Sequence, residues 1–206
     1  MAERLTRDAR RAQLLDVAWS IIGREGTDAL TLARLAEQAG VSKPMAYDHF
    51  GTRAGLLSAL FRSFDVRQVD AMRAAMAEGG DTLRAATRIA AAGYLDCVAG
   101  NGPEWDQLCA ALLAYEETKD HLHESRRFFA EAYREVFAPF VALDGAHGRA
   151  TLTALVGAAE ALARDLHAGA FGLRTAIDTL ADLMYATLAP AAAAPPTRAR
   201  ARGRRA

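Results

Sequence analysis

The sequence predicts an all-α protein, and three observations support that prediction. Alanine, leucine, arginine and glutamate, which favour helices, are abundant along nearly the whole chain. Apolar residues recur at helical spacing, and no stretch of alternating β-branched residues is long enough to indicate a sheet. The chain has 206 residues, of which 51% are hydrophobic, so it holds ample material for a core. We expect about nine helices, arranged as an N-terminal three-helix bundle with a helix-turn-helix and a C-terminal helical bundle.

The first helix is expected to begin at about Thr6, whose hydroxyl is suited to capping an N-terminus, and to end at Gly23 and Gly26. Its apolar residues fall on one face at helical spacing. These inward residues are Leu14, Leu15, Ala18, Ile21 and Ile22.

Two short helices joined by a tight turn are predicted between residues 31 and 50. Thr31 can cap the first of them, and Gly40 can end it because glycine adopts positive φ without steric cost. Ser42 is placed to cap the second helix. Pro44 lies in its first turn, where a missing N–H removes no intrahelical bond. This order of signals is the layout of a helix-turn-helix, a motif that binds DNA.

A long helix follows the break at Gly51-Thr52 and stops at Gly79-Gly80. Later helices are expected at residues 82–99, 103–117, 119–140, 146–168 and 172–188, with short connections that favour a compact bundle. Residues 190–206 are rich in proline, alanine and arginine, and we expect them to form a disordered basic tail. The predicted domains are therefore 1–51, 52–189 and the tail.

Composition limits the classes of function. The net charge is zero, and the apolar stretches are shorter than the roughly 20 residues of a membrane span. The N-terminus carries charges where a signal peptide has an apolar run, so we expect a cytoplasmic protein without membrane contact. A reduced, packed state is expected for Cys97 and Cys109 rather than a disulfide.

The first 57 residues resemble the DNA-binding domain of the TetR (tetracycline repressor) family of bacterial transcriptional regulators. The matching positions are Arg11, Leu14, Leu15, Ala18, Gly26, Leu30-Thr31, Leu35-Ala36, Ala39-Gly40-Val41-Ser42, Tyr47, His49-Phe50, Arg53 and Leu56-Leu57. The resemblance implies a homodimeric regulator that binds double-stranded operator DNA. The alternative, a helical hairpin with an accidental match, agrees less well with so many matching positions.

The resemblance places the DNA contacts on and around the second helix of the motif. The phenol of Tyr47 and the imidazole of His49 can donate to phosphate, and Thr31 and Ser42 present helix N-termini that suit phosphate. Arg53 keeps the charge that family members usually carry as lysine.

Base contacts are expected from Lys43, which can donate to guanine, and from Pro44 and Met45, which suit a thymine methyl. These positions and Asp48 depart from commoner family patterns; Asp48 is expected to turn toward Arg34 or Arg53 or to accept from cytosine.

Some of these residues have a second interpretation. His49 is alternatively a packing residue. The arginines near the chain start are alternatively an ordinary solvated face; they are Arg7, Arg10 and Arg11.

The last two helices offer the best dimer surface, because a stripe of small residues permits close approach of a second helix. That stripe comprises Ala150, Ala154, Gly157, Ala158 and Ala161. A matching apolar stripe comprises Leu173, Ile177, Leu180, Leu183, Met184 and Leu188. The alternative is that both stripes pack within one chain.

An aromatic-rich set in the middle helices is the expected binding site for an unknown small molecule. The candidates are Tyr94, Trp105, Cys109, Phe129 and Tyr133. Ordinary core packing is the alternative for each, and a helical domain that binds only protein is the alternative for the whole. His121 and His123 are two apart and point to different sides of a helix, so no metal is predicted. No cofactor and no catalytic motif is predicted either, and we expect a repressor released from a palindromic operator by its ligand.

Overall fold

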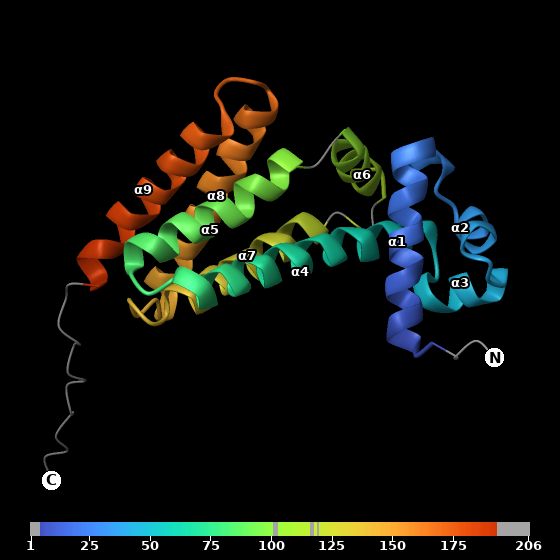
Figure 1. Cartoon of the computed structure of the whole chain (residues 1–206), viewed down its shortest axis with the longest axis horizontal. Helices are drawn as coiled ribbons and strands as arrows, with labels where there is room; N and C mark the ends of the chain where they lie inside the picture. The colour runs from blue at the N-terminus through green and yellow to red at the C-terminus, as the bar shows by residue number, and fades with distance from the viewer. Residues whose placement is uncertain (1–4, 101–102, 116–117, 119, 193–206) are drawn as a thin grey trace, which may run out of the picture.

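The computed structural model describes residues 5–100, 103–115, 118 and 120–192. These residues form nine α-helices, one short 3-10 helix and no strand, which confirms the all-α prediction (Figure 1). No helix within the described ranges is long and apolar enough to cross a membrane. The predicted basic tail lies almost wholly outside the described residues.

The N-terminal helices lie together at one end of the molecule (Figure 1). They are α1 (Arg7–Glu25), the 3-10 helix η1 (Thr27–Ala29), α2 (Leu32–Ala39) and α3 (Lys43–Phe50). Thr6 caps α1 as predicted, because its side chain accepts from the Ala9 amide. Gly23 does not end α1, contrary to expectation; it lies inside the helix, and Gly26 ends it with φ of 81°. A single interior glycine costs only about 1 kcal/mol relative to alanine, which the packed face of α1 outweighs.

The turn between α2 and α3 forms as its sequence predicts. The Thr31 hydroxyl accepts from the Arg34 amide at 3.1 Å, and the Ser42 hydroxyl accepts from the Met45 amide at 3.4 Å. Gly40 adopts the left-handed conformation with φ of 65°, where a side chain would be strained. These caps set the chain reversal that presents α3.

The remaining helices are α4 (Arg53–Gly79), α5 (Leu83–Gly100), α6 (Pro103–Leu113), α7 (His121–Phe137), α8 (Gly145–His167) and α9 (Leu173–Ala192). α7 ends three residues earlier than predicted, since Pro139, which follows the C-cap Ala138, has no backbone N–H to continue the helical hydrogen bonds. α6 also ends early, and the Thr118 hydroxyl donates to the Leu112 and Tyr115 carbonyls near its end. α9 continues through Pro190, beyond the predicted end, among alanines that favour helix.

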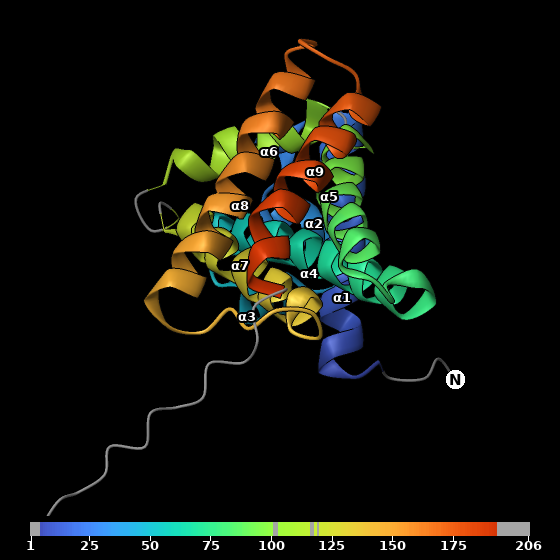
Figure 2. The same ribbon diagram turned by 90° about the vertical axis from the view of Figure 1, so that its left-hand side faces the viewer.

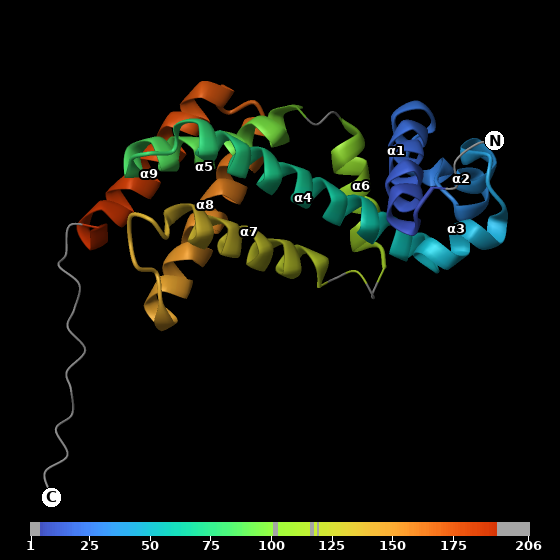
Figure 3. The same cartoon turned by 60° about the horizontal axis from the view of Figure 1, so that its bottom comes forward.

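Two hydrophobic cores hold the chain together. The N-terminal core is built on α1 to α3, and α4 and α6 complete it with Leu56, Leu57, Ala59, Leu60, Phe61, Leu108 and Leu112. The C-terminal core joins the far half of α4 to α5, α7, α8 and α9. Because α4 contributes to both cores, the break at residue 51 between α3 and α4 is not the boundary of the N-terminal core. Figure 2 shows α8 and α9 in front, at the end away from α3, and Figure 3 shows α7 running alongside α4.

Candidate nucleic-acid interface and helical pocket

One face of α3 is exposed while the other is buried. Ala46 is fully buried and Phe50 is 8% exposed, so both anchor the helix to the N-terminal core. On the outer face Met45 is 36% exposed and Tyr47 is 52% exposed. Lys43 is also exposed, and it forms no ion pair with any described residue. An apolar and aromatic surface left open in this way, beside an unpaired cation, is typical of a binding surface.

Asp48 is exposed beside this surface and does not pair with either arginine proposed for it. Arg34 instead binds Glu25 at 2.8 Å and Glu37 at 3.1 Å. The expectation that Asp48 turns toward Arg34 or Arg53 is therefore wrong, because both guanidinium groups have other partners.

His49 is half-buried, and its Nδ1 has no hydrogen-bond partner among the described residues. Burial lowers the pKa of His49 below its ordinary value of 6.5, and the nearby Arg7 and Arg11 lower it further. The ring is therefore neutral at physiological pH and lies 6.0 Å from the Phe50 ring, measured between centroids. His49 therefore packs against Phe50 and, as a neutral imidazole, can also donate one hydrogen bond.

Arg11 closes the C-terminal end of α3. Its Nη1 donates to the His49 carbonyl at 2.5 Å, and its guanidinium lies 4.8 Å from the centroid of the Phe50 ring. A cation at a helix C-terminus interacts favourably with the helix dipole. Arg11 therefore fixes the orientation of α3 relative to α1.

Arg53 lies at the start of α4, but its guanidinium points into the protein. It donates through Nε to the Leu30 carbonyl at 2.8 Å and through Nη2 to the Thr27 carbonyl at 2.6 Å. Its Nη1 donates to the Tyr115 hydroxyl at 2.6 Å. These bonds correct the prediction of a phosphate contact: Arg53 joins the loop before α2 to the segment after α6.

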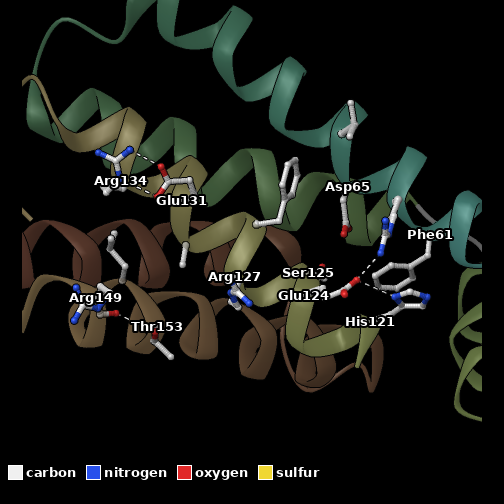
Figure 4. Close-up of a pocket in the computed structure, with 15 residues that line it drawn as sticks. Phe61, Asp65, His121, Glu124, Ser125, Arg127, Glu131, Arg134, Arg149 and Thr153 are labelled. Carbon is white, nitrogen blue, oxygen red and sulfur yellow. Dashed lines mark hydrogen bonds and ion pairs between the residues drawn. The ribbon is translucent and has the colours of Figure 1, made fainter. Parts of the chain in front are cut away.

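A pocket of about 860 Å³ lies between α4, α7 and α8 (Figure 4). Apolar groups on its wall include Phe61, Phe128 and Leu152, and the polar groups include Asp65 and Ser125. Asp65 is only 5% exposed, and burial raises the pKa of its carboxyl to about 7. Sequence reasoning missed Asp65.

The predicted ligand residues do not gather in this pocket. Tyr94 and Phe129 meet edge to face with centroids 5.1 Å apart, and Tyr133 is fully buried, so all three belong to the packing of the C-terminal core. Cys109 packs against the N-terminal core. The side chain of Trp105 lies outside the described residues.

The fold and the exposed α3 together define a helix-turn-helix protein with a second, helical domain. Residues 14–60 match the family model described as bacterial regulatory proteins, tetR family. The N-terminal helices therefore match the DNA-binding part of this family.

Two curated relatives match the N-terminal part. The regulator BetI of Rhizobium meliloti is 44% identical over 54 residues, which are 26% of this chain and 27% of that protein. The activator FasR of Mycolicibacterium smegmatis is 34% identical over 95 residues, covering 46% of this chain and 43% of that one. The chain thus matches less than half the length of either relative.

Solved structures share the fold over most of the chain. A TetR-family regulator from Streptomyces coelicolor has a TM-score of 0.63 at 20% identity, covering 88% of this chain and 99% of that one. The multidrug binding protein EbrR, complexed with imidazole, has a TM-score of 0.61 at 18% identity, covering 92% and 98%.

Proposed function

We propose that this protein is a cytoplasmic homodimeric transcriptional regulator that binds a palindromic operator through α3 and releases it when a small molecule binds the helical domain. The observation that carries the proposal is the exposed outer face of α3, anchored from behind by Ala46 and Phe50. Lys43, Pro44 and Met45 lie at the N-terminal end of α3, the part that enters the major groove in proteins of this kind.

The DNA contacts divide into two kinds. Lys43 and Met45 read bases, whereas the Tyr47 hydroxyl donates to phosphate and positions the helix. Thr31 and Ser42 contribute the N-termini of α2 and α3, whose free amides suit phosphate. His49 supports this surface as a neutral donor, while Arg53 holds the domain together.

α8 offers the surface for a homodimer. Ala150, Ala154, Gly157 and Ala161 are exposed, and a Cβ added at Gly157 meets no atom within 4 Å. In α9, by contrast, Leu180, Met184 and Leu188 are buried within the chain, and Leu183 is 44% exposed. We therefore place the small-residue stripe of α8 at the centre of the interface, with Leu183 beside it.

A helical domain that binds only protein is expected to lack a ligand-sized cavity. The pocket between α4, α7 and α8 therefore favours a small molecule as the partner of this domain. The fold of EbrR accommodates imidazole in its crystal structure, which supports the same choice.

Selection of bound sequences from a random double-stranded DNA library tests the proposal with the full chain. We expect an enriched palindrome, a changed preference at one base pair for Lys43→Ala, and weaker binding to all sequences for Tyr47→Phe. Tyr185→Phe, which removes a hydroxyl from α9, is the matched control and leaves binding unchanged. Enrichment of no sequence, or an equal loss for Lys43→Ala on every sequence, contradicts the assignment.

A further inference from the structure

Asp65 is a buried acid that forms no ion pair with any described residue. It lies on α4 in the wall of the pocket, where Ser125 of α7 is the hydrogen-bonding group that lowers the pKa of its carboxyl against the larger effect of burial. Figure 4 shows the carboxyl pointing from α4 toward Ser125. Arg62, three residues before Asp65 on α4, binds Glu124 instead, with 2.6 Å between Nη2 and Oε2.

The other carboxylates of the pocket already have partners. Glu124 also accepts from His121 at 3.0 Å, and Glu131 is bound by Arg134. Both are half exposed, so water stabilises their charge as well. Asp65 alone among the described acids of this pocket is buried and lacks a cation.

An unpaired buried carboxylate is costly, because the low-polarity interior replaces its water without supplying a counter-charge. The raised pKa of Asp65 has this cause. A ligand that brings a positive charge removes the cost, and it interacts favourably with the faces of nearby aromatic rings, here Phe61 and Phe128. Of the described carboxylates in this pocket, ionised Asp65 is therefore the one that a bound cation stabilises most.

We propose that this pocket binds a small protonated organic amine, whose ammonium group pairs with the Asp65 carboxylate while its apolar part lies against Phe61, Phe128 and Leu152. The proposal rests on the proposed function, since it names the chemical class of the ligand that the regulator senses. An ammonium group supplies several N–H donors, which can satisfy both carboxylate oxygens.

The rim of the pocket carries the opposite charge and defines the competing ligand class. Arg127 and Arg149 are exposed and form no ion pair with any described residue. Exposed guanidinium groups stay hydrated and gain little from a partner, whereas a buried carboxylate gains much. Anion binding at these two arginines is therefore the outcome that overturns the proposal.

Calorimetric titration of the full-length protein at pH 8 with three probes of similar shape tests the ligand class. The probes are benzylamine, benzyl alcohol and benzoate, which carry positive, zero and negative charge. We expect benzylamine to bind at least about tenfold more tightly than benzyl alcohol, and benzoate to bind most weakly. Tighter binding of benzoate, equal binding of the amine and the alcohol, or no detectable binding of benzylamine refutes the proposal.

Variants then test the role of Asp65. Asp65→Asn is expected to weaken benzylamine binding at least about tenfold and to change benzyl alcohol binding less than about twofold. Glu131→Gln removes a paired carboxylate from the same pocket and is the matched control, with an expected change below about twofold. Asp65→Ser provides a second replacement if the asparagine variant folds poorly. Equal loss in the Glu131 and Asp65 variants shows a non-specific charge effect and contradicts the proposal.

DNA selection on the same proteins separates this proposal from the proposed function. Asp65→Asn lies outside α3 and is expected to enrich the same sequences as the unmodified chain. If the chain selects no DNA but benzylamine binding still depends on Asp65, the regulatory function fails and the amine site stands. If DNA is selected but the probes show no dependence on Asp65, the amine site fails alone.

Discussion

Replacing Asp65 by asparagine should stabilise the protein above neutral pH, by an amount that follows from the burial of this one carboxyl. Asp65 is 5% exposed, and its pKa is raised from 3.8 to about 7 in the folded chain. The folded state therefore binds the proton more tightly than the unfolded state, so the free energy of unfolding falls as pH rises from about 4 to 7 and then levels off. A difference of about three pKa units corresponds to about 4 kcal/mol at pH 8.

Urea unfolding of the full chain at one fixed protein concentration, at pH 5 and at pH 8, measures this effect. Asparagine does not titrate, so the stability of Asp65→Asn relative to the unmodified chain should rise by roughly 2 to 3 kcal/mol between pH 5 and pH 8. Asp16→Asn, which changes an exposed acid on α1, is the control and should show almost no such rise. A stability difference for Asp65→Asn that does not vary with pH refutes the reasoning.

Three further predictions concern the DNA-binding end. Gly40→Ala should destabilise the chain by about 1 kcal/mol, because Gly40 has positive φ, whereas Gly23→Ala should stabilise the interior of α1 by up to about 1 kcal/mol. Thermal unfolding measures both variants. A change in stability of the same sign in the two contradicts the backbone assignment. Arg11→Gln should weaken DNA binding without changing the slope of log affinity against log salt; a slope reduced by about 0.9 per subunit would instead reveal a phosphate contact. Arg53→Gln should cost about 2 kcal/mol in urea unfolding and also leave the salt slope unchanged.

Local signals explain the parts of the fold that the sequence predicts well. Helix caps depend on residues within about four positions along the chain, so the residue types there are sufficient to predict them. This holds for the caps at Thr6, Thr31 and Ser42 and for the left-handed Gly40. The end of α6 was less predictable, because the hydroxyl of Thr118, five residues beyond the helix, donates to the Leu112 carbonyl near its end.

The candidate sites depend on contacts between distant segments, which spacing alone does not show. Arg53 has the position expected of a phosphate contact, but Thr27 and Tyr115 bind it from segments 26 and 62 residues away. Asp65 did carry a usable signal, since it interrupts the apolar face of α4 directly after Phe64. An acid on the inward face of a helix indicates a candidate functional site. The prediction of the ligand site relied instead on the aromatic residues of the middle helices.

The sharing of α4 between two cores determines what can be exchanged between relatives of this protein. α4 has 27 residues and spans about 40 Å, and its first turns fill the N-terminal core together with Leu108 and Leu112 of α6. A chimera joined at residue 51 keeps the whole reading surface but acquires a foreign α4 and α6 beneath it. Grafts of the proposed DNA specificity onto another helix-turn-helix protein should therefore transfer only the exposed side chains of α3 and keep the host's own interior.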